Sequence, residues 1–277
     1  MTTASVRVVF KVGTIALLLW FAALPVYWML VTAFQSNEAL FASPPELLPQ
    51  PAYVTNIVKA LSETGLIGRW IWNSFIIATG TALISVLLAA PAAYAISRFR
   101  FKGRGSLSLG LFVTQMLPEA LLVVPLFTLF LQLGLLNSLF GLALADAAFV
   151  MPVAVWILVT AIDGIPPELE ESARIDGCPP IAIPLRVVFP LVRPALAAAT
   201  VVTFFAGWNE YLFAVQFITD AHRWPASVGL ASFTGEYLTP LNLVMSAALL
   251  FSLPAIAFFL ILQRQIVSGL TAGSVKG

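Results

Sequence analysis

Charged residues are scarce in this sequence of 277 residues, because Asp, Glu, Lys and Arg together make up only 10%. A soluble domain usually carries about 25% charged residues. With 60% apolar residues, the chain lacks the polar surface that a water-soluble particle needs. Its 14 basic and 13 acidic residues nearly cancel, which excludes a nucleic-acid-binding protein that works through a concentrated basic face. The composition therefore predicts an integral membrane protein.

Residues for catalysis and metal binding are also few. Cys178 is the single cysteine, which excludes an internal disulfide and a cysteine-based metal site. His222 is the single histidine, which excludes multi-histidine metal sites and a serine hydrolase with a histidine at bilayer depth. No Gly-x4-Gly-Lys-Ser/Thr phosphate loop occurs, so we expect no ATP site of this type in the chain. We therefore expect no catalytic residues, no metal site and no enzymatic activity.

Long runs without charge predict the membrane spans. A helix of roughly 20 residues crosses a bilayer, so the stretch between Arg104 and Asp163 is long enough for two helices. The Gly134–Ser138 run supplies a turn between them. We predict an all-α integral membrane protein with one transmembrane domain, residues 1–277. Its six transmembrane helices are expected at about 12–34, 71–97, 107–133, 142–162, 195–219 and 238–263.

The basic residues are distributed unevenly among the predicted loops. With the N-terminus inside, the inner segments hold 11 of the 14 Lys and Arg residues, and the outer loops hold Lys59, Arg69 and Arg223. Because cytoplasmic loops carry the excess of basic residues, both termini are predicted to be cytoplasmic. The first span is too long for the apolar part of a signal peptide, so it should remain in the mature protein.

The inner loop 163–194 is too long for a simple connection, and its first half predicts a short helix. Pro167 suits the first helical turn, and Gly177 suits the left-handed position after the last turn. Glu170 and Arg174 are spaced to form an ion pair on this helix. The loop carries five acidic residues against three arginines, which disfavours attraction to anionic lipid. Docking to another protein is the better interpretation.

The same loop contains a longer pattern of Glu171-Ser172-Ala173, two residues, Asp176-Gly177 and, thirteen residues after the glycine, Pro190. This pattern resembles the EAA loop of ABC importer permeases, which runs Glu-Ala-Ala, two residues, Asp-Gly and later Leu-Pro. Further stretches are similar to the carbohydrate branch of that family, and together they cover essentially the whole chain. These stretches are Asn73-Ser74, Tyr94-Ala95-x-x-Arg98-x-x-Phe101-x-Gly103, Trp208-Asn209-Glu210 and, like the tail of maltose-permease G-type subunits, residues 269–277.

The resemblance implies a type I ABC importer permease fold and a mono-, di- or oligosaccharide as the transported substrate, with a glycerol phosphate as the alternative substrate of the same branch. It implies a place in a bacterial or archaeal plasma membrane, in contact with lipid. The implied partners are a second homologous permease, two ATP-binding cassette subunits that bind ATP and Mg, and an extracytoplasmic sugar-binding protein. This chain itself would need no cofactor and would bind no nucleic acid.

The resemblance also implies two contacts with the ATPase subunits. The EAA loop would supply a coupling helix that docks on them and transmits their movements to the translocation path. The C-terminal tail would be inserted between them. The implied ATPase-coupling residues are Glu171, Ser172, Ala173, Asp176, Gly177 and Pro190, and the implied tail contacts are Thr271, Gly273, Ser274 and Lys276.

Three features depart from the family pattern. Ser172 replaces the first alanine, and Cys178 replaces a common alanine. Three prolines between residues 179 and 184 crowd the second short segment, 181–189. Because a proline in a helix interior costs roughly 3 kcal/mol, we expect this second segment to be bent or shortened.

Polar residues at bilayer depth mark a candidate substrate path, because such groups are costly in lipid and usually face a cavity or a partner. An aromatic ring beside hydrogen-bonding groups suits a sugar. These groups can also tie helices together, and residues 208–210 can act in gating instead of substrate contact. Asp146 is expected to meet water near the outer end of the fourth span. The candidate path residues are Gln115, Glu119, Trp208, Asn209 and Glu210.

The alternative to an importer permease is a secondary transporter or a channel that works without an ATPase. Secondary transporters commonly contain internal repeats, and none is found in this sequence. The long inner loop would also have no purpose in such a protein. An importer permease should carry an ATPase subunit through detergent extraction, whereas a channel should not.

Overall fold

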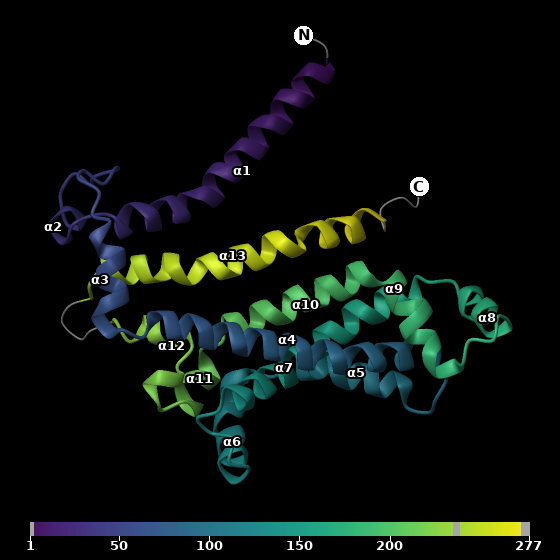
Figure 1. Ribbon diagram of the computed structural model, residues 1–277. Coiled ribbons are helices and arrows are strands. Elements are labelled where there is room, and N and C mark those ends of the chain that lie inside the picture. The colour runs from purple at the N-terminus through teal and green to yellow at the C-terminus, as the bar shows by residue number, and fades with distance from the viewer. Residues whose placement is uncertain (1–2, 235–238, 273–277) are drawn as a thin grey trace. The chain divides into compact units, whose positions relative to one another are not determined.

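The computed structural model describes residues 3–234 and 239–272, and within these ranges the chain is all-α and contains no strand (Figure 1). The described residues fall into two compact units, Met1–Ile67 with Leu230–Leu253 and Gly68–Gly229 with Pro254–Gly277. The all-α fold predicted from the sequence is confirmed.

Four helical stretches of the described chain are long and apolar enough to cross a membrane. They are Phe10–Ala33, Ile67–Arg98, Leu139–Asp163 and Leu241–Gln263. Two further helix pairs meet this criterion jointly, each with a sharp bend at a short break, and they raise the number of spans to six if each pair is one span. The chain is therefore a multi-pass membrane protein.

The first unit is built on the end of the first span. Its elements are α1 (Thr3–Ala33), α2 (Asn37–Leu40), α3 (Thr55–Thr64) and the first part of α13 (Leu241–Ala272). Asn56 in α3 donates hydrogen bonds to the backbone oxygens of Ala33 (3.0 Å) and Gln35 (2.9 Å). Ser246 in α13 also donates to the oxygen of Ala33 (3.1 Å). These bonds satisfy carbonyl groups that the end of α1 leaves without helical partners.

The second unit holds most of the membrane helices, and α4, α5, α7 and α10 run alongside one another in it (Figure 1). α7 packs against both α5 and α10. Ala89, Ala90 and Ala93 of α4 are buried in its core, as expected of small residues that allow close helix packing. The helices up to α12 are α4 (Ile67–Arg98), α5 (Arg104–Thr114), α6 (Glu119–Gln132), α7 (Leu139–Asp163), α8 (Glu168–Ile175), α9 (Phe189–Leu191), α10 (Arg193–Trp208), α11 (Leu212–Phe217) and α12 (Ala226–Ala231).

The helix predicted over residues 107–133 is interrupted in the structure. α5 ends at Thr114, α6 begins at Glu119, and the two are bent by 99°. Pro118 precedes α6 with an extended backbone (φ −64°, ψ 119°). Proline has no N–H to donate to the preceding turn, and it disfavours the helical conformation of Leu117. Two helices therefore replace the single helix that was expected.

The helix predicted over residues 195–219 is also interrupted, because three residues separate α10 from α11. The side chain of Glu210 lies in this break. Its Oε1 accepts hydrogen bonds from the backbone N–H groups of Phe213 (2.5 Å) and Ala214 (3.1 Å). A carboxylate at a helix N-terminus satisfies free N–H groups and interacts favourably with the helix dipole. Glu210, expected inside a continuous span, thus starts a new helix.

α13 continues further than the sequence indicated. Its predicted end was near residue 263, but the helix runs to Ala272. Gly269 does not end it, because one glycine in a helix costs only about 1 kcal/mol relative to alanine.

Candidate functional site

The inner loop forms the short helix that the sequence predicted. α8 begins after Pro167, and Gly177 has the left-handed conformation (φ 82°). The N–H of Gly177 donates to the oxygen of Arg174 (3.1 Å), and the N–H of Cys178 donates to the oxygen of Ala173 (2.9 Å). This pair of bonds is the Schellman motif, which closes a helix at a glycine. The position of α8 in the chain is thus fixed at both ends by local sequence.

A buried ion pair ties α8 to the end of α4. The Nε of Arg98 lies 2.5 Å from Oε1 of Glu170, and the hydroxyl of Tyr94 donates to Oε2 of Glu170 at 2.8 Å. The expected pairing of Glu170 with Arg174 is therefore wrong, because Glu170 turns inward and pairs with Arg98. The sequence analysis missed this contact, because 72 residues separate its partners.

Arg98 also binds the backbone around the start of the loop. Its Nη2 donates to the oxygens of Ile162 and Ile165, both at 2.9 Å. Ser97 donates a short hydrogen bond to Asp163. The end of α4 therefore holds both the last turn of α7 and α8. A movement of α8 must therefore move α4 and α7 with it or break the hydrogen bonds at the end of α4.

The face of α8 opposite Glu170 is exposed. The motif residues Glu171, Ser172 and Asp176 are exposed, as is Ile175, which is 87% exposed. Ser172 donates to the backbone oxygen of Glu168 (2.9 Å), which satisfies the hydroxyl within the helix. The structure thus places acidic and apolar motif groups together on a surface that another protein can reach.

The second short segment is bent, as its prolines predicted. A 3-10 turn (Pro180–Ala182), a π-helical turn (Pro184–Val188) and α9, which contains Pro190, follow one another. This stretch meets α10 at a bend of 82°. Ile183 and Val188 are buried, so the segment is anchored although it is irregular.

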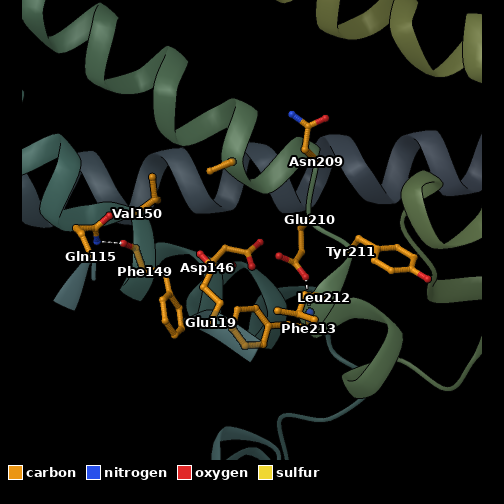
Figure 2. Close-up of a pocket in the computed structure, with 11 residues that line it drawn as sticks. Gln115, Glu119, Asp146, Phe149, Val150, Asn209, Glu210, Tyr211, Leu212 and Phe213 are labelled. Atoms are coloured by element: carbon orange, nitrogen blue, oxygen red, sulfur yellow. Dashed lines mark hydrogen bonds between the residues drawn. The ribbon is translucent and has the colours of Figure 1, made fainter. Parts of the chain in front are cut away.

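A cavity of about 350 Å³ lies where the two interrupted spans meet α7 (Figure 2). Four of the five candidate path residues line it: Gln115, Glu119, Asn209 and Glu210. These four residues lie at or next to the breaks in the two spans and share one space. The remaining lining residues are Asp146, Phe149, Val150, Ala206, Tyr211, Leu212 and Phe213.

Two of the cavity amides also hold neighbouring backbone. Nε2 of Gln115 donates to the oxygen of Phe149 in α7 (2.6 Å), so it ties α5 to α7. Nδ2 of Asn209 donates to the oxygen of Phe205 (2.9 Å) and closes the end of α10. Both amides keep free oxygen lone pairs, so the structural role and a ligand contact are compatible.

Trp208 lies apart from the other candidate path residues. Its side chain is 2% exposed and is not among the residues that line the cavity. The indole stacks against Phe204, with ring centroids 5.8 Å apart and planes 17° from parallel. The aromatic residues that do line the cavity are Phe149, Tyr211 and Phe213.

Asp146 is the acidic residue of the cavity that the sequence analysis did not select. It was expected to meet water near the end of α7, but it is only 5% exposed and forms part of the cavity wall. Oδ2 accepts a long hydrogen bond from Oγ1 of Thr81 (3.4 Å). A carboxylate inside an otherwise apolar run was the signal available in the sequence.

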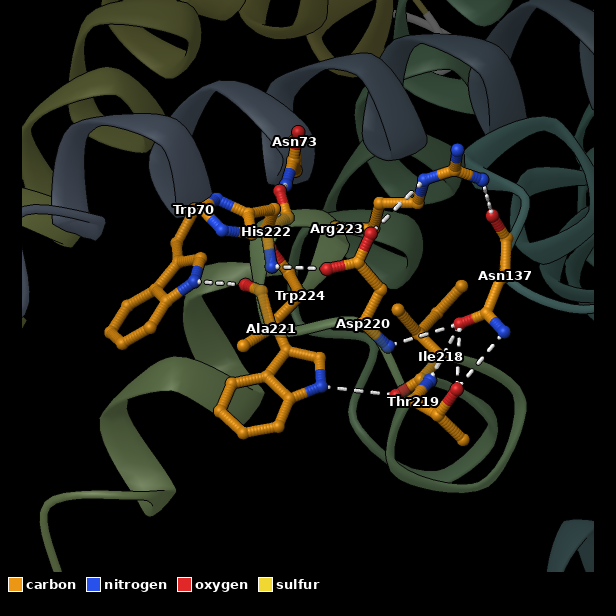
Figure 3. Close-up of polar contacts among 10 residues, drawn as sticks. All are labelled: Trp70, Asn73, Asn137, Ile218, Thr219, Asp220, Ala221, His222, Arg223 and Trp224. Atoms are coloured by element: carbon orange, nitrogen blue, oxygen red, sulfur yellow. Dashed lines mark hydrogen bonds and ion pairs between the residues drawn. The ribbon is translucent and has the colours of Figure 1, made fainter.

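A separate polar cluster holds the segment after α11 (Figure 3). Asn73 donates to the backbone oxygens of His222 (3.0 Å) and Trp224 (2.9 Å), and Ser74 accepts from the N–H of Ala226 (2.9 Å). Asn137 accepts from two further N–H groups of the same segment. The side chains of Asn73 and Ser74 therefore hold the backbone between His222 and Ala226 in place.

The tail residues lie at or beyond the limit of the described chain. Thr271 is in the last turn of α13, and Gly273, Ser274 and Lys276 lie outside the described residues. Within the described ranges, no group of three or more His, Cys, Asp or Glu side chains could hold a metal ion.

Comparison with known proteins shows one family match. Residues 83–271 match the family described as binding-protein-dependent transport system inner membrane component. The matched region includes α8, both interrupted spans and the acidic cavity.

Sequence relatives match over nearly the full length. The chain is 34% identical over 273 residues to the trehalose/maltose transport system permease protein MalG of Thermococcus litoralis, covering 98% of this chain and 97% of the relative. It is 32% identical to the trehalose transport system permease protein SugB of Mycobacterium tuberculosis, covering 94% and 95%.

A solved structure shares the fold. A chain of a bacterial ABC transporter involved in the import of the acidic polysaccharide alginate aligns with a TM-score of 0.79. The two sequences are 22% identical, and the alignment covers 95% of this chain and 98% of that one.

Proposed function

Because the chain belongs to the family of binding-protein-dependent transport system inner membrane components, we propose that it is the membrane subunit through which an ATP-driven importer moves a carbohydrate. The family is that of carbohydrate ABC importer permeases, whose chains are membrane components and not catalytic subunits. The relatives named for trehalose and maltose support a mono-, di- or oligosaccharide as cargo.

The observation that carries the coupling role is the construction of α8. The helix is closed by Gly177, held to α4 through Glu170 and exposed along its Glu171–Ser172 side. A helix that is firmly held on one face and open on the other can transmit a push from a docked partner. A secondary transporter or channel would have no use for this arrangement.

The proposed partners follow from the family. Two ATP-binding cassette subunits would dock on α8 and would bind ATP and Mg, so this chain would carry no cofactor of its own. A second, homologous permease would complete the translocation path, and an extracytoplasmic binding protein would deliver the sugar. The assembly would lie in a bacterial or archaeal plasma membrane, with both termini of this chain in the cytoplasm.

The charge of the cavity should favour some transported sugars over others. Glu119, Asp146 and Glu210 line it, so a polyanion such as the alginate of the structural relative would meet repulsion there. A neutral or cationic sugar would not be repelled by these carboxylates.

Co-purification and uptake test this proposal. The chain should retain an ATPase subunit through detergent extraction, and the complex in vesicles should accumulate labelled maltose or trehalose only when ATP and binding protein are supplied. Sugar flux that needs no ATPase would contradict the proposal. Gly177→Asp should keep the complex assembled and abolish uptake. Gly177→Asn is its matched control, because asparagine and aspartate tolerate the left-handed conformation alike and differ in charge, so uptake should be less impaired.

A further inference from the structure

A second large cavity lies at the end of α4 that holds α8. It has a volume of about 760 Å³ and is formed by the last turns of α4, by α9 and α10, and by the bent segment that contains Pro180 and Pro184. Apart from Tyr94, the residues that line it are all apolar. The hydroxyl of Tyr94 already donates to Glu170, so the wall contains no unpaired polar side chain. We call this cavity the apolar groove.

The length of the apolar groove corresponds to one leaflet of a bilayer. Its wall on the α4 side runs from Val86 to Phe99, positions that are roughly 20 Å apart at the rise of a helix. One leaflet contributes about 15 Å of hydrocarbon. With 32 residues, α4 is longer than the hydrocarbon core, so its last turns reach the level of the lipid headgroups. The groove therefore extends from the hydrocarbon of one leaflet to the headgroups.

Apolar side chains of the bent segment remain exposed along the groove. Ile181 is 87% exposed and Leu185 is 68% exposed. A concave apolar surface of this kind is a binding site for an apolar group. A membrane-spanning helix of a protein partner would cross both leaflets and be roughly 30 Å long, whereas the groove covers one leaflet. The groove therefore fits the acyl chain of a lipid better than a helix.

Two arginines adjoin the groove at the headgroup level. Arg100 directly follows the wall residue Phe99, and Arg186 directly follows the wall residue Leu185. Both arginines are exposed, and neither has an ion pair or a hydrogen bond among the described residues. The five acidic residues of the loop all precede Gly177, so the segment that borders the groove carries arginine and no carboxylate. This end of the groove is therefore positively charged, although the loop as a whole is acidic.

We propose that the apolar groove binds an acyl chain of an anionic phospholipid and that Arg100 and Arg186 hold its headgroup. Guanidinium groups bind phosphate oxygens through short, charge-assisted hydrogen bonds. Basic pockets between membrane helices recognise anionic headgroups in the same way. The apolar wall binds the chain of any phospholipid, so the two arginines supply the selectivity for negative charge.

Photolabelling with two lipids that have identical chains tests the proposal. The intact transporter is reconstituted into phosphatidylcholine vesicles that contain a small fraction of a probe lipid with a photoreactive group on its acyl chain. The probe is either phosphatidylglycerol or phosphatidylcholine, and mass spectrometry measures how labelling of residues 86–99 and 181–189 depends on its fraction. Two arginines at the membrane surface predict roughly 30-fold tighter binding of phosphatidylglycerol in the groove.

Variants at exposed positions locate the selectivity. Arg100→Gln and Arg186→Gln should each reduce the preference for phosphatidylglycerol about fivefold, and the double variant should abolish it. Arg69→Gln is the matched control, because it removes an exposed arginine from the opposite end of α4 and should leave the preference unchanged.

Three results would overturn the inference. The first is equal labelling of the groove by the two probe lipids, and the second is a preference for phosphatidylglycerol that the double variant retains. The third is the absence of lipid labels from residues 181–189 in the intact transporter, which is expected if a protein partner covers the groove instead.

Discussion

The ion pair between Arg98 and Glu170 makes a quantitative prediction about the coupling loop. Their side chains are only 14% and 4% exposed, so solvent screens the pair weakly. Removing one partner of a buried ion pair costs about 3–5 kcal/mol. Glu170→Gln should cost less, because its amide oxygen can still accept from Arg98, which also keeps two bonds to backbone carbonyls. We expect a loss of about 2 kcal/mol, as for one hydrogen bond to a charged group.

Hydrogen exchange of the amides in α8 measures this loss where it occurs. A loss of about 2 kcal/mol corresponds to a roughly 30-fold larger population of the open loop, and exchange should accelerate by the same factor. Glu168→Gln is the matched control, because it removes an exposed carboxylate from the same helix. Its effect on the helix dipole should stay below about 1 kcal/mol. Equal acceleration in the two variants would refute the reasoning.

A double-mutant cycle separates the pair from its surroundings. Arg98→Met and Glu170→Leu each leave the partner charge buried and unpaired, whereas the double variant leaves neither. The double variant should therefore be less destabilised than the sum of the single variants, by at least about 1 kcal/mol. If the stability lost in the double variant equalled the sum of the losses in the two single variants, the two charges would not stabilise one another.

Three further predictions concern topology, the loop glycine and the tail. In a Cys178→Ser background, a cysteine at Ser43 should react with an impermeant thiol reagent in whole cells and one at Ser106 should not, since both are exposed and only the first is predicted to lie outside; the reverse pattern would overturn the orientation. Gly177→Ala should destabilise α8 by about 1–2 kcal/mol through its left-handed backbone alone, because a Cβ there would meet nothing within 4 Å, and melting of the purified complex measures it. Deletion of residues 271–277 should leave membrane insertion intact but weaken uptake and the response of the ATPase, and wild-type uptake would show that the tail has no coupling role.

Local signals in the sequence located α8 well. Pro167 and Gly177 act on their own neighbours, so their effect on the helix ends does not depend on the rest of the fold. The prolines between 179 and 184 likewise predicted an irregular second segment. The partner of Glu170 could not be found in this way, because local spacing favoured Arg174 and the true partner lies on α4.

Four of the residues that line the cavity were selected from the sequence, but the geometry of the cavity was not predicted. Polar residues in apolar runs identified Glu119 and Glu210, but hydropathy alone treats each span as one straight helix. The breaks depend on Pro118 and on capping by Glu210, and these breaks create the cavity. Asp146 was assigned to water because its depth was judged from its place in the span, whereas its burial depends on neighbouring helices.

The contact of α10 with α4 at Gly207 has a mechanical consequence. A Cβ on Gly207 would lie 2.7 Å from Oγ1 of Thr81 and 3.0 Å from Cα of Ala78, so only a residue without a side chain fits against α4 at this point. Sliding along this contact would bring a residue with a side chain against Thr81 and Ala78, whereas tilting about it keeps Gly207 in place. We therefore expect α10 to tilt rather than slide against α4, with Gly207 as the fixed point of the contact.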